Sequence, residues 1–149
     1  MSLEAKIMDQ LKVAMKAKDE AALRSLRAIK AAIIIEKTAE GAADVLSEAT
    51  ETKMLQKLAK QRRDSLEIFV KQNREDLAQK EREELAIIEK FLPAQMTKDE
   101  LHAELKAIIA QVGATSPADM GKVMGVASKQ LAGKTDGKSI SDAVKQLLA

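Results

Sequence analysis

Apolar residues recur at intervals of three and four positions along most of the chain. In the first segment they are Leu3, Ile7, Leu11, Ala14 and Met15. This spacing places the side chains on one face of an amphipathic helix, whereas a half-buried strand would alternate at every second position. The same period predicts seven helices, at about residues 3–18, 20–37, 48–71, 77–92, 98–112, 117–132 and 138–148. No segment alternates as a strand does, so the sequence predicts an all-α fold.

The periodic positions also predict the core. The second segment continues the pattern through Leu23, Leu26, Ile29, Ile33 and Ile34. Later segments contribute Met54, Leu55, Leu58, Ala59, Leu66, Phe69, Leu77, Ala78, Leu85, Ile88, Leu92, Leu101, Leu105, Ile108, Ile109, Val112, Met120, Val123, Met124, Ala127, Leu131, Ile140, Ala143, Val144, Leu147 and Leu148.

Capping residues mark several helix ends. Asp19 can accept a hydrogen bond from a free amide of the helix that follows it. Thr97–Glu100 matches a capping box, in which the threonine oxygen and the glutamate carboxylate each accept from the other's amide. Ser116 before a proline predicts the start of the sixth helix, and Gly113 can adopt the left-handed conformation that ends the fifth.

Pro93 is the clearest boundary in the chain, because a proline disfavours helical conformation in the residue before it. It divides the predicted helices into four and three. We therefore expect two small helical domains, residues 1–94 and residues 95–149. The second has about 55 residues, a size that can fold.

Composition excludes several classes of function. The 149 residues are 46% hydrophobic and 32% charged with a net charge of +2, which is typical of a globular protein and too small for electrostatic capture of a polyanion by the whole molecule. There is no cysteine, and an isolated His102 is typical of a surface or packing role. We expect no catalytic residue, no metal and no cofactor. No stretch approaches the roughly 20 apolar residues of a membrane span, so a cytoplasmic protein without membrane association is expected.

Arg62 and Arg63 are adjacent in the third predicted helix. They could bind a phosphate through paired hydrogen bonds, since a guanidinium matches the geometry of an oxyanion. Lys60, Asp64 and Glu67 surround them. Charges of both signs at three- and four-residue spacing favour the alternative, a solvated helix face with local ion pairs.

Gly121 and Gly125 lie four residues apart in the sixth predicted helix. Glycine costs about 1 kcal/mol in a helix relative to alanine, so two of them indicate a close approach to the bare backbone. Either another helix packs there or an extended ligand, such as a sugar–phosphate chain, lies along it. Lys122 and Lys129 share the adjacent face.

Lysines accumulate towards the carboxyl terminus. Residues 120–149 contain Lys122, Lys129, Lys134, Lys138 and Lys145 against two aspartates, a local charge of +3. Lys134 and Lys138 lie in or beside a glycine-containing turn whose amides can donate, which predicts a phosphate cradle. The spacing is not that of a P-loop.

Taken together, these motifs closely resemble the GatB/YqeY family over essentially the whole chain. The matching segments are Met15–Asp19, Leu26–Lys30, Gln61–Ser65, Arg74–Ala78, Glu89–Pro93, Asp119–Gly125 and Asp136–Lys138. The resemblance implies an all-helical two-domain protein whose second domain is similar to the tail of the B subunit of tRNA-dependent amidotransferase, which holds tRNA. It points to Gly121, Lys122, Gly125, Lys134 and Lys138 as tRNA-facing positions, to which helical geometry adds Lys129.

Three hypotheses follow. The first is a non-catalytic accessory protein that binds tRNA or another structured RNA through phosphate contacts of the carboxyl-terminal domain. The second, from the resemblance, is a component or regulator of a glutamine-dependent tRNA amidotransferase, a carbon–nitrogen ligase whose catalytic residues this chain lacks. The third is a protein-interaction adaptor in which the two glycines form a helix-packing groove.

Overall fold

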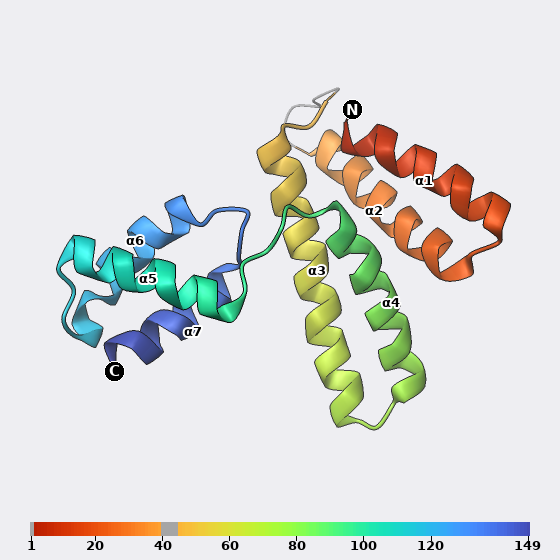
Figure 1. The fold of residues 1–149 in the computed structure, drawn as a ribbon. Helices are drawn as coiled ribbons and strands as arrows, with labels where there is room; N and C mark the ends of the chain where they lie inside the picture. Colours follow the sequence, from red (N-terminus) through yellow and green to blue (C-terminus); the bar gives the residue numbers. More distant parts are fainter. Residues whose placement is uncertain (1, 40–44) are drawn as a thin grey trace. The chain divides into compact units, whose positions relative to one another are not determined.

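The structure, a computed structural model, describes residues 2–39 and 45–149. Within those ranges it contains helices and no strand, so the all-α prediction is confirmed (Figure 1). The helices are α1 (Leu3–Ala17), α2 (Glu20–Thr38), α3 (Glu48–Lys71), α4 (Glu75–Phe91), α5 (Lys98–Val112), a 3-10 turn (Pro117–Asp119), α6 (Met120–Gln130) and α7 (Gly137–Leu148).

The chain forms two compact units, one ending at Pro93 and one spanning Ala94–Ala149. The first unit contains α1 to α4 and the second contains α5 to α7 (Figure 1). That the two units are independently folding domains stays a prediction.

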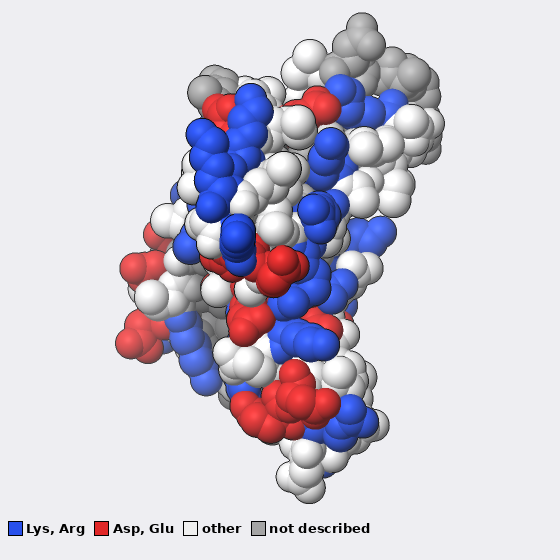
Figure 2. Space-filling model, turned by 90° about the vertical axis from the view of Figure 1, so that its right-hand side faces the viewer, with Lys and Arg blue, Asp and Glu red and all other residues white. Residues whose placement is uncertain are grey.

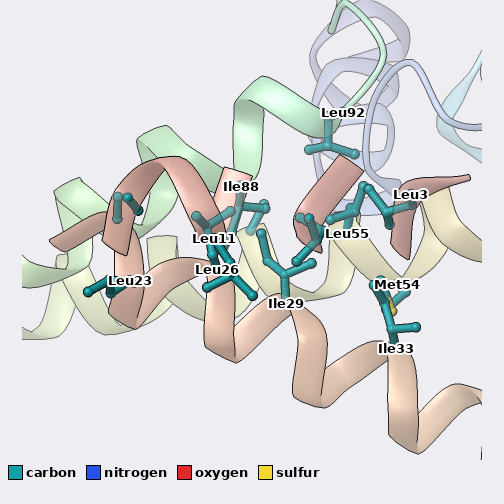
Figure 3. Packing of buried hydrophobic residues seen from close by; sticks show 14 residues of the cluster. Leu3, Leu11, Leu23, Leu26, Ile29, Ile33, Met54, Leu55, Ile88 and Leu92 are labelled. Carbon is teal, nitrogen blue, oxygen red and sulfur yellow. The ribbon is translucent and has the colours of Figure 1, made fainter. Parts of the chain in front are cut away.

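The core of the first unit is formed by apolar side chains from all four of its helices. Leu11, Leu26, Ile29 and Ile88 come from three of these helices and pack together in Figure 3, and Leu55 adds the contribution of α3. Each is less than a tenth exposed. The three- and four-residue period therefore identified these core positions correctly.

Two residues assigned to apolar faces are not in the core. Met15 is 60% exposed and Ile34 is 50% exposed, so their predicted burial is wrong. Both lie at the edge of the stripe that the neighbouring helices cover. Leu66, Phe69 and Leu77 are only half-buried.

Ion pairs between α2, α3 and α4 add to the apolar core. Glu84 of α4 is 9% exposed and accepts from Arg24 of α2 and from Arg62 of α3, each at 2.8 Å. Arg24 also pairs with Glu83 at 2.9 Å, and Arg62 with Glu81 at 3.2 Å. A single buried carboxylate thus joins two cations from different helices.

The second unit buries one face of each of its helices. Leu105 of α5, Val123 and Ala127 of α6 and Val144 of α7 are fully buried. The apolar period therefore predicts the inward face of all three helices.

The predicted caps are confirmed at all but one of the helix ends. Asp19 accepts from the amide of Ala22 at 3.0 Å, and Thr97 forms the capping box with Glu100. Gly113 has φ 69° and ends α5 in the left-handed conformation. Ser116 is the exception, because its side chain caps nothing and residues 117–119 form a 3-10 turn before α6.

Candidate nucleic-acid interface

The orientation of α6 follows from its buried residues. Val123 and Ala127 point into the core, so positions about half a turn away point outward. Gly121 and Gly125 are on this outward face and are exposed. Apart from its chain neighbours and the backbone of its own helix, a Cβ atom added to either glycine would meet no described atom within 4 Å. Within the described residues of the second unit no helix packs against these glycines, so the helix-packing alternative has no support there and the backbone at both positions is exposed.

Two lysines accompany the glycines on this face. Lys122 and Lys129 are both exposed and lie two helical turns apart, about 10.5 Å along the axis. No ion pair joins either lysine to a carboxylate of the described residues. Lys122 does contribute, as a smaller cause, to the lowered pKa of Asp119, which results mainly from a hydrogen bond that the Thr115 amide donates. Both lysine charges are thus available to an anionic ligand.

Backbone hydrogen bonds fix the loop that carries Lys134. Gly133 has φ 80°, a left-handed conformation that favours glycine, and its carbonyl accepts from the Gln95 side chain at 3.0 Å. The Lys134 carbonyl accepts from the Met96 amide at 2.9 Å. Lys134 itself is exposed. The loop is therefore held to the segment that precedes α5, with the ammonium group free to face solvent.

Lys138 lies in the first turn of α7 and is also exposed. Asp136 caps this helix by accepting from the Ser139 amide at 2.6 Å, and the Asp136 carbonyl accepts from the Ile140 amide at 3.2 Å. Two of the donors that a phosphate could use are therefore taken by the chain itself. What this turn offers an anion is chiefly the charge of its lysines.

The sequence-predicted site residues thus fall into two groups. Gly121, Lys122, Gly125 and Lys129 share the outward face of α6, whereas Lys134 and Lys138 follow on the next loop and helix. We call these six residues the glycine–lysine surface. That it contacts RNA stays a prediction.

The other candidates are engaged elsewhere or isolated. Arg62 is held by Glu81 and Glu84, so the phosphate interpretation of this arginine loses its support. The alternative of local ion pairs is confirmed for Lys60 and Asp64, at 4.0 Å, but the carboxylates that bind Arg62 are 19 and 22 positions away and had no signal in the sequence. His102 is half-buried, and its Nε2 atom has no hydrogen-bond partner in the described part of the chain.

The described part of the chain shows neither a metal-binding group nor a membrane-spanning helix. The described residues contain no group of three or more His, Cys, Asp or Glu that could hold a metal ion. No helix among them is long and apolar enough to cross a membrane. Figure 2 shows Lys and Arg side chains on one face in rows interrupted by Asp and Glu, so charge by itself does not identify a binding surface on that face.

The chain is similar to known proteins over most of its length. A family model described as Yqey-like protein matches residues 4–148. The Kluyveromyces lactis protein named "Altered inheritance of mitochondria protein 41, mitochondrial" is 30% identical over 143 residues, which cover 95% of this chain and 73% of that protein. Both similarities extend over both compact units.

Proposed function

The chain belongs to the YqeY-like family, and from this premise we propose that it is a non-catalytic accessory protein that binds tRNA or another structured RNA. The ligand lies on the glycine–lysine surface of the second unit. The observation that carries this proposal is the open backbone of α6, where two glycines with no neighbour within 4 Å are accompanied by two exposed, unpaired lysines.

Close approach and charge act together on such a surface. A phosphate chain that lies against glycine is nearer to the helix backbone than one held off by a side chain. Lysines beside it then replace the condensed counterions of the phosphates. This combination favours the sugar–phosphate chain over the bases.

The aromatic residues support contact with the backbone of the nucleic acid. The sequence has two phenylalanines and no tryptophan or tyrosine, and Phe69 and Phe91 are both half-buried in the first unit. Proteins that bind single strands stack the bases on exposed aromatic rings. A folded RNA, recognised through its phosphates and shape, fits this surface better than a single strand does.

A titration of the full chain with total tRNA tests the proposal. We expect micromolar or tighter binding that weakens steeply as salt rises. The triple variant Lys122→Glu, Lys134→Glu and Lys138→Glu should lose at least about tenfold in affinity, and the slope of log K against log salt should fall by roughly 2 to 3, about one unit for each lost phosphate contact.

A charge-matched variant controls for net charge. Lys6, Lys12 and Lys16 of α1 are exposed and form no ion pair with the described residues, so changing all three to Glu alters the net charge equally in the first unit. Loss of affinity confined to the first triple variant assigns binding to the glycine–lysine surface. Equal losses in the two variants, or unchanged affinity in the first, would remove that site.

The two other hypotheses lead to different results. A component or regulator of a tRNA amidotransferase should co-purify with the subunits of that enzyme. A protein-interaction adaptor should bind a partner protein and be indifferent to RNA. Absence of tRNA binding even at low salt would therefore favour the adaptor hypothesis, in which Gly121 and Gly125 form the face that binds the partner protein.

A further inference from the structure

The outward face of α2 is apolar between Ala28 and Ile35. Ala28 and Ala31 are exposed, and Ile34 and Ile35 are 50% and 64% exposed. Ile29 and Ile33, on the opposite side of the same helix, are in the core. The inward face is therefore fully used, and the outward stripe of two alanines and two isoleucines has no partner among the described residues of the first unit.

The order of small and large residues on this stripe makes it complementary to itself. Ala28, Ala31 and Ile35 follow one another at spacings of three and four, the seam of a helix pair. Two copies of α2 packed antiparallel about an axis near Ala31 would place Ile35 of each copy against Ala28 of the other. The same contact, a large side chain against a small one, then occurs once in each direction, as a two-fold axis requires.

Charges on the same face agree with the antiparallel arrangement. Arg27 is exposed and forms no ion pair with the described residues. In the antiparallel pair it lies beside the carboxyl end of the other α2, where the helix dipole favours a cation. A parallel pair would instead place the two Arg27 side chains together.

From these observations we infer that a second copy of this chain covers the outward face of α2, which makes the protein a two-fold symmetric dimer through an antiparallel α2 pair. The inference is independent of the proposed RNA binding, since it concerns the first unit and a different surface. The stripe from Ala28 to Ile35 extends over about two turns, roughly 10.5 Å, and so buries less than the roughly 1,200 Å² of a standard stable interface. The dimer is therefore concentration-dependent.

Sedimentation of the full chain from about 5 to 500 µM tests for a weak dimer. We expect monomer at the low end and mainly dimer at the high end. Ile35→Glu should raise the dissociation constant by at least about tenfold, because the carboxylate would be buried in the pair. Ile68→Glu is the matched control, since Ile68 is 52% exposed on α3 and outside the stripe.

Cross-linking gives a second test that does not depend on affinity. The sequence has no cysteine, so Ala31→Cys introduces a single thiol next to the expected axis. Mild oxidation should join this variant into disulfide-linked dimers much faster than Ile68→Cys, because a disulfide needs Cα atoms within about 7 Å. A chain that remains monomeric at 500 µM, an unchanged dissociation constant in Ile35→Glu, or equal cross-linking of the two cysteine variants would overturn the inference.

Discussion

Gly125 offers a change that should move folding stability and RNA affinity in opposite directions. It is the sixth of eleven residues in α6, it is exposed, and an added Cβ would have no described atom within 4 Å apart from its chain neighbours and the backbone of its own helix. Alanine should therefore fit without displacing any neighbour. The gain is the difference in helix propensity, about 0.8 to 1 kcal/mol. Gly121 has the same open surroundings but is the second residue of α6, so the gain there should be smaller.

Hydrogen exchange of α6 amides in the full chain measures this gain locally. A stabilisation of about 1 kcal/mol slows exchange through opening of the second unit by about fivefold. Ala107→Gly is the reciprocal control. Ala107 is exposed in the middle of α5, so this change should destabilise the same unit by about the same amount.

The same variant tests the proposed function. A methyl group at position 125 holds a phosphate chain away from the helix backbone, so Gly125→Ala should weaken tRNA binding by about tenfold, or ~1.4 kcal/mol. Ala107→Gly should leave the affinity unchanged. Faster exchange in Gly125→Ala would refute the open geometry of α6, whereas slower exchange with full affinity would refute close approach of the ligand at Gly125.

Three further predictions concern the framework. Glu84→Gln removes the charge that holds two arginines of different helices, and it should lower the free energy of unfolding of the first unit by about 2 kcal/mol in a urea titration; an unchanged midpoint would contradict this. Thr97→Ala removes a capping-box hydrogen bond and should cost about 1 kcal/mol, measured by thermal unfolding. The hydrogen bonds from Arg74 lower the pKa of Asp76 from 3.8 to about 2, so this carboxylate stabilises the fold above pH 4 and loses that effect as the pH falls towards 2. A carboxyl NMR titration with its midpoint near pH 4 would contradict the pair.

Local signals explain how much of the fold the sequence predicts. A capping side chain and the amide that it satisfies lie three residues apart, so Asp19 and the Thr97 box can be recognised without knowledge of tertiary structure. A period of three and four likewise gives the direction of a helix face. It does not give the width of the face that neighbouring helices cover, and for that reason Met15 and Ile34, at the edges of their stripes, were assigned to the core incorrectly.

The ion-pair partners of the charged residues could not be predicted, because they depend on contacts between residues far apart in the sequence. Arg62 has Asp64 close by in sequence, but its carboxylate partners come from α4. Arginine in a helix interacts with whichever carboxylate the packing of the next helix brings to it, and that packing depends on the register of two helices rather than on local spacing. The buried Glu84 therefore could not be distinguished from the surface acids around it.

The two glycines of α6 could be singled out from sequence because they lower helix stability wherever they are placed. The sequence could not decide whether a neighbour within the chain packs against the glycines and offsets that cost. Among the described residues of the second unit, no neighbour does. Inside the unit they lower stability by up to about 2 kcal/mol and gain no packing in return. The ligand proposed above, which needs the bare backbone, would account for an exposed glycine pair with unpaired lysines beside it.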